Sequence, residues 1–144
     1  MPKSKTTLFA KPNPGQARPD FTTIDAIGEA FGVRVPHRGY LRPSSVLISN
    51  RNLQLWWPNE ANETYENKIS GDGKTVTSRP RKSPCPIGAI EKEEREGIRT
   101  AIFFKPKKGA YGYRFVGVFQ PDPEASRQQN RHVRVRAEDQ IELP

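Results

Sequence analysis

Residues 105–119 read KPKKGAYGYRFVGVF, and this stretch joins a basic cluster to an aromatic, β-prone run through glycines. Aromatic and β-branched residues over 113–119 predict a strand, and the glycine-containing segment 105–112 predicts the loop that leads into it. A strand that begins at a cationic, aromatic loop is a plausible surface for a polyanion. The stretch therefore indicates binding rather than catalysis.

Side chains alternate between the two faces of a strand. We therefore expect the odd-numbered residues Tyr113, Phe115, Gly117 and Phe119 to share one face and Arg114, Val116 and Val118 to share the other. Phe115 and Phe119 are expected in the core. Gly117 is a site for a bulge or for a close approach of another segment.

The rest of the chain predicts short strands joined by turns, with few helices. Residues 46–57 split into two strands around the polar turn 49–52, and 98–104 form a strand before the loop at 105. Further predicted elements are a hairpin with strands at 65–70 and 75–78, a Thr-capped helix at 22–32, a loop or charged helix at 87–96, a short helix from Asp122, and an alternating tail at 132–143.

Length and composition place the chain in the α+β class. Its 144 residues suit one domain, and 33% hydrophobic content with 14 prolines and 11 glycines favours turns over long helices. We predict an extended basic arm over residues 1–20. Residues 21–144 are predicted to form a single domain built on a curved, mostly antiparallel, barrel-like sheet with one or two short helices.

The charge balance favours a nucleic-acid partner. Twenty-four Lys and Arg residues outnumber 16 Asp and Glu residues, giving a net charge of +8. The simpler alternative is that this charge only maintains solubility. Cys85 is the single cysteine, no apolar run has membrane-spanning length and the N-terminus lacks a secretion signal, so a cytoplasmic protein without a membrane partner is expected.

Basic residues gather in three separate clusters, around 79–82, 105–108 and 127–136. Lys and Arg that neutralise phosphates release counterions, and aromatic side chains nearby can stack on bases. DNA is favoured over RNA as the partner. The residues predicted to contact the backbone are Arg79, Arg81, Lys82, Lys105, Lys107 and Lys108, and those predicted to stack on a base are Trp56 and Tyr111.

The residues that metal and cofactor chemistry needs are scarce. His37, His132 and Cys85 cannot complete a four-ligand zinc site without carboxylate help, and the glycine pairs fit no phosphate-binding loop followed by a helix. No metal, cofactor or catalytic residue is therefore predicted. Asp72 has acidic and lysine neighbours that a magnesium-dependent nuclease could use, but its place between two glycines is explained by a turn.

Several short motifs carry a family resemblance: Trp57-Pro58, Tyr65-Glu66-Asn67, Ser70-Gly71-Asp72-Gly73, Phe104-Lys105 and residues 113–119. Their arrangement, over about the second and third quarters of the chain, resembles small β-barrel modules attached to bacterial restriction enzymes and helicases. Those modules are similar to the PUA-like superfamily, which includes readers of modified bases. The resemblance implies a curved sheet whose loops hold nucleic acid, with one aromatic pocket that inspects a base, in a protein of bacterial or phage type.

The leading hypothesis is a non-enzymatic nucleic-acid-binding module that contacts phosphates through Lys and Arg and holds a base in an aromatic pocket. A small metal-dependent nuclease using Asp72 is the first alternative. The second is a protein-interaction module that regulates or inhibits a nucleic-acid enzyme, and a nuclease or helicase is a conceivable protein partner in either binding hypothesis. Charge alone does not separate these hypotheses.

Overall fold

The computed structural model describes residues 6–11, 19–35, 45–48, 51–107 and 112–144. Three helices and nine strands are assigned within these ranges. The helices are α1 (Ile24–Ala30), α2 (Ile87–Arg95) and α3 (Pro123–Gln129). The strands are β1 (Thr7–Phe9), β2 (Ser45–Ile48), β3 (Leu53–Trp56), β4 (Tyr65–Ile69), β5 (Thr75–Pro80), β6 (Arg99–Phe104), β7 (Arg114–Pro121), β8 (His132–Glu138) and β9 (Gln140–Glu142).

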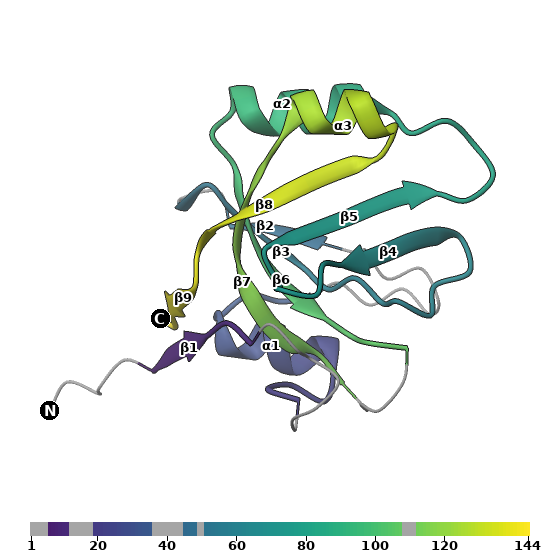
Figure 1. Cartoon of the computed structure of the whole chain (residues 1–144). Coiled ribbons are helices and arrows are strands. Elements are labelled where there is room, and N and C mark those ends of the chain that lie inside the picture. Colours follow the sequence, from purple (N-terminus) through teal and green to yellow (C-terminus); the bar gives the residue numbers. More distant parts are fainter. Residues whose placement is uncertain (1–5, 12–18, 36–44, 49–50, 108–111) are drawn as a thin grey trace, which may run out of the picture.

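Seven strands form the main sheet in the order β2-β3-β6-β7-β8-β5-β4 (Figure 1). Every neighbouring pair is antiparallel except β3 and β6. The two predicted hairpins, β2–β3 and β4–β5, are both present. The sheet curls without closing, so β2 and β4 remain its edges. The predicted α+β class with a mostly antiparallel sheet is confirmed, and "barrel-like" describes the open sheet only loosely.

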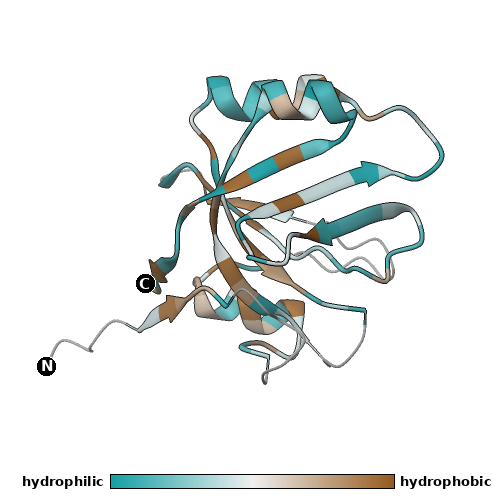
Figure 2. Ribbon diagram, viewed as in Figure 1, coloured by the Kyte–Doolittle hydropathy of each residue, from teal (hydrophilic) through white to brown (hydrophobic). Residues whose placement is uncertain are grey.

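The sheet has a buried apolar layer on each face. On one face, Phe103 and Phe115 pack with Ile27 and Phe31 of the α1 region and with Ile141 of β9. The other face carries a second apolar layer, to which five strands contribute because the sheet curls. Its buried members are Val76, Ile102, Phe104, Val116 and Phe119, and Trp56 and Ile69 pack at its margin. Figure 2 shows apolar residues gathered on the central strands of the sheet.

The strand β7 contains a bulge at Gly117, which corrects one prediction. Ile102 pairs with Gly117 but Phe103 pairs with Phe115, so Val116 is an extra residue on β7. Both Phe115 and Phe119 are buried as predicted, but they lie in opposite layers rather than on one face. Gly117 has φ of +133°, and a Cβ there would lie 2.5 Å from Cδ of Arg136, so the backbone and the packing both require glycine.

Local signals explain where the helices begin and end. Thr23 caps α1 through a hydrogen bond that its Oγ1 accepts from the Ala26 N–H, as the Thr-capped helix prediction required. Asp122 caps α3 in the same way, with Pro123 at its first position, and Asn130 ends this helix in the left-handed conformation. The charged stretch at 87–96 forms α2. None of the helices in the described ranges is long and apolar enough to cross a membrane.

The segment that leads into the domain is tied to the sheet. β1 pairs with β9, and Phe21 bridges to Tyr113. Asp20 accepts hydrogen bonds from Lys11 Nζ at 2.7 Å and from the Phe115 N–H at 2.9 Å, and it lies 3.7 Å from the buried guanidinium of Arg114. Burial lowers the pKa of Arg114 and the Asp20 carboxylate opposes that shift. Part of the predicted arm is thus ordered, and the boundary between arm and domain stays a prediction.

Candidate nucleic-acid interface

A concave pocket of about 500 Å³ opens where the sheet fails to close. Its walls come from strands that lie near opposite edges of the sheet: β3 contributes Gln54 and Trp56, and β4 contributes Tyr65 and Asn67. A larger hollow of about 920 Å³ lies along β8 and β9, but its described lining contains no aromatic residue. The concave pocket is therefore the one suited to a flat ring.

Two polar side chains inside the concave pocket hold each other in place. Asn67 and Ser78 are cross-strand partners on β4 and β5, and both are buried. Ser78 Oγ donates to Asn67 Oδ1 at 2.7 Å, while Asn67 Nδ2 donates to the Asn59 carbonyl at 2.9 Å. This network ties the β4–β5 hairpin to the loop that follows β3. The polar wall of the pocket is consequently fixed before any ligand enters.

Trp56 forms an aromatic wall of the pocket and contacts a buried ion pair. The guanidinium of Arg134 lies over the Trp56 ring, 4.9 Å from its centroid. Glu93 of α2 accepts two hydrogen bonds from Arg134, one of them from Nε at 3.2 Å. Both charged side chains are nearly buried, at 7% and 13% exposure. Helix α2 therefore supports the pocket through Arg134.

Asparagine turns shape the loop between β3 and β4. Asn59 Oδ1 accepts from the Ala61 N–H, and Asn62 Oδ1 accepts from the N–H groups of Thr64 and Tyr65. The Asn62 carbonyl in turn accepts two hydrogen bonds from Arg81, at 3.1 and 3.2 Å. The loop therefore holds the side chain of Arg81, which directly follows β5, close to the mouth of the pocket.

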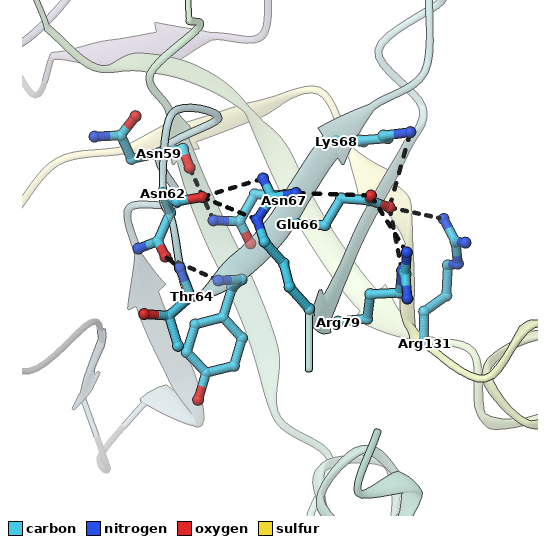
Figure 3. Close-up of polar contacts among 10 residues, drawn as sticks. Asn59, Asn62, Thr64, Glu66, Asn67, Lys68, Arg79 and Arg131 are labelled. Atoms are coloured by element: carbon cyan, nitrogen blue, oxygen red, sulfur yellow. Dashed lines mark hydrogen bonds and ion pairs between the residues drawn. The ribbon is translucent and has the colours of Figure 1, made fainter. Parts of the chain in front are cut away.

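The outer face of the β4–β5 hairpin carries a group of cations around one carboxylate (Figure 3). We call this group the hairpin cation cluster; it consists of Lys68, Arg79, Arg81 and Arg131, all within 4.0 Å of Glu66. The hydrogen bond from Arg79 is the main cause that lowers the pKa of Glu66, and the surrounding positive charges add to it against a smaller opposing effect of burial. Glu66 therefore stays ionised at neutral pH.

The predicted site residues lie in different places, some in the concave pocket and some on the outer face of the β4–β5 hairpin. Trp56 lines the concave pocket, and Arg79 and Arg81 belong to the hairpin cation cluster. Arg81 and Lys107 line one hollow, so the first two basic segments are adjacent, while Lys105 lies over the Tyr113 ring at 5.7 Å. Lys82 is exposed after the end of β5. Lys108 and Tyr111 lie outside the described residues, and the roles of all eight in binding stay predictions.

The third basic segment is divided among different partners. Arg127 pairs with Glu91 and Arg134 with Glu93, both on α2, whereas Arg131 reaches Glu66. Arg131 is therefore the member of this segment that joins the residues predicted from 79–82.

The surroundings of Asp72 and Cys85 give both residues structural roles. The carboxylate of Asp72 accepts from Ser70 Oγ at 2.6 Å and from the Lys74 N–H at 3.0 Å, which closes the β4–β5 turn and lowers the pKa of Asp72. Burial raises the pKa of the Cys85 thiol, which disfavours the nucleophilic thiolate. Within the described ranges, no three His, Cys, Asp or Glu side chains are grouped so that they could hold a metal ion.

The pocket residues that sequence reasoning missed are Asn67, Ser78 and Glu93, while Arg134 was assigned to the third basic segment rather than to the surroundings of Trp56. Alternation along the β4–β5 hairpin would have placed Asn67 and Ser78 on one face, because the predicted turn fixes the register. The pair of Glu93 with Arg134 joins residues 41 positions apart, and no local pattern indicates it.

The described strands form an open, curled sheet, and the concave pocket lies between β3 and β4. The chain belongs to the SRA family, the SET and RING associated domain, which matches residues 20–143. This domain is a PUA-like, DNA-binding reader of modified cytosine. Membership confirms the predicted resemblance and, at the coarse level, the prediction of a nucleic-acid-binding module.

A solved structure supports the fold. The chain is similar to the 5-hydroxymethylcytosine-specific restriction enzyme AbaSI, with a TM-score of 0.57 and 18% sequence identity. The similarity covers 85% of this chain but 39% of that protein, so the chain spans well under half of the enzyme. No curated protein matches the sequence.

Proposed function

We propose that this chain is a DNA reader that holds one modified cytosine, turned out of the duplex, in the concave pocket. The observation that carries the proposal is the combination, in one pocket, of the Trp56 ring with the fixed polar pair Asn67 and Ser78. An aromatic face stacks on any base, whereas fixed donors and acceptors select among base edges. Family membership supports the same ligand class.

In the bound state, the base stacks on the ring of Trp56, which lines the pocket. Tyr65 and Tyr113 also line the pocket and enclose the base from other directions. The backbone of the DNA is held by basic side chains near the mouth, among them Arg81, Lys105 and Lys107. Phosphate contacts then fix the register while the pocket supplies selectivity.

Competition binding with three otherwise identical duplexes tests this proposal. The duplexes carry a single cytosine, 5-methylcytosine or 5-hydroxymethylcytosine, and 2-aminopurine beside that base reports unstacking by a rise in fluorescence. We expect one modified duplex to bind at least about tenfold more tightly than the unmodified one. Trp56→Ala should weaken that binding by about 1–3 kcal/mol, the usual contribution of base stacking.

Phe9→Ala is the matched control, because Phe9 is an aromatic residue that is 60% exposed and lies on β1, away from the pocket. It should leave the preference unchanged. Equal affinity for all three duplexes would reject a reader of these modifications, and a preference that survives Trp56→Ala would remove the concave pocket from recognition.

A further inference from the structure

We propose that the hairpin cation cluster is a binding site for a DNA backbone phosphate, and that Glu66 is its positioning residue. This inference rests on the proposed function, since it takes DNA as the ligand. It goes beyond the contacts predicted at Arg79 and Arg81, because it adds Lys68 and Arg131 and gives Glu66 a role.

The four cations lie around Glu66, but only Arg79 is hydrogen-bonded to its carboxylate. Arg79 hydrogen-bonds to both Glu66 oxygens, at 3.2 and 3.4 Å. Lys68 and Arg131 lie 3.8 Å from Glu66 Oε1, and Arg81 lies 4.0 Å from Oε2, all beyond hydrogen-bond distance. Lys68 Nζ and Arg131 Nη1 therefore remain available to a second anion, whereas Arg81 also donates two hydrogen bonds to the Asn62 carbonyl. Four cations against one carboxylate leave a charge of +3 on the cluster.

The guanidinium of Arg131 is not fully hydrogen-bonded within this network, and its side chain is 28% exposed. Its Nε is shielded from solvent and has no hydrogen-bond partner among the residues that the structure describes. Buried donors in folded proteins nearly always have partners, and exceptions often mark functional positions. A phosphate presents several acceptor oxygens and would suit both this guanidinium and its neighbours.

The cluster lies beside a hollow that borders the proposed base site. This hollow, of about 380 Å³, is lined by Lys68, Arg81 and Lys107 together with Asn67, Glu66 and Glu60, and Glu60 Oε1 accepts a hydrogen bond from the Lys107 N–H at 2.9 Å. Asn67 also lines the concave pocket, so the two hollows meet at this residue of the edge strand β4. A DNA strand that places a base in the pocket can therefore pass its backbone along the outer face of the hairpin. This adjacency favours a DNA phosphate over an acidic protein surface.

The salt dependence of binding to an unmodified duplex tests the phosphate site. The variant is Lys68→Gln combined with Arg131→Gln, which removes two charges while keeping polar side chains. Loss of one phosphate contact should reduce the slope of log affinity against log salt concentration by about 0.9. Affinity at low salt should fall several-fold. A slope equal to that of the wild type would overturn the inference.

Lys92→Gln combined with Arg95→Gln on α2 is the charge-matched control, because both residues are exposed and lie outside the cluster. A slope that falls equally in both double variants would also overturn the inference, since net charge alone would explain it. Equal unfolding midpoints exclude a folding defect. The proposed function is judged separately, from the preference of the wild type for modified DNA, so either proposal can fail while the other stands.

Discussion

The two faces of the β4–β5 hairpin differ although they are made by alternate residues of the same two strands. The inner face presents Asn67 and Ser78, buried and hydrogen-bonded to each other. The outer face presents Glu66 and Arg79, which pair amid a surplus of positive charge. A fixed neutral wall suits selection of a base, whereas a charged outer surface suits a phosphate. Because successive side chains of a strand point to opposite faces, one hairpin can select a base with its inner face and bind a phosphate with its outer face.

The largest contrast is expected between a buried and an exposed ion pair on the same helix. Glu93→Gln leaves the guanidinium of Arg134 buried without its counter-charge, so the free energy of unfolding should fall by about 3 kcal/mol. Glu91→Gln is the control, because its pair with Arg127 is about half exposed and should contribute less than about 1 kcal/mol. Urea unfolding of both variants measures this. Equal losses would show that the buried pair contributes no more to stability than the exposed one.

A smaller contrast is expected between neighbouring residues on opposite faces of β4. Asn67→Ala removes the partner of the Ser78 hydroxyl and of the Asn59 carbonyl, and should lower the free energy of unfolding by about 2 kcal/mol. Lys68→Ala removes an exposed cation and should change it by less than about 0.5 kcal/mol. If Lys68→Ala is the more damaging change in thermal or urea unfolding, the division between the faces is wrong.

The smallest effect concerns the pH dependence of the outer face. Because the folded protein lowers the pKa of Glu66, chiefly through the hydrogen bond from Arg79, ionised Glu66 stabilises the fold above its ordinary pKa of 4.5. This contribution is lost as the pH falls through the lowered pKa. The difference in unfolding free energy between the wild type and Glu66→Gln should therefore shrink between neutral pH and about pH 3. A difference that grows on acidification would contradict this assignment.

Much of the fold is predictable because its signals are local. The Thr23 cap, the turn at Asp72 and the alternation of β3 each depend on residues close in the sequence. The layer assignment of Phe119 was wrong because the bulge at Gly117 reverses the alternation, and its position depends on the partner strand β6. The sequence indicated Gly117 as a site for a bulge, but it did not show that the bulge would move Phe119 to the other layer.

The candidate site was less predictable than the fold. Trp56 and the basic segments could be named from the sequence because aromatic and cationic residues are themselves the signal, and their roles in binding stay predictions. The pocket wall was missed because its polar members, such as Asn67, resemble ordinary strand residues until the curled sheet brings β3 and β4 to one cavity. Arg134 was difficult for a different reason. Its place in a charged tail predicts an exposed cation, but the side chain lies buried against Trp56.

The bulge at Gly117 also limits how this chain can vary in length. Before it, odd-numbered residues such as Phe115 belong to the α1 layer, and after it the even-numbered Val118 takes that place. A one-residue deletion or insertion within β7 would exchange the layers of every following side chain in the strand, turning two well-filled cores into mismatched ones. Tolerated changes in length should therefore be confined to the connections between strands, while β7 keeps a constant length.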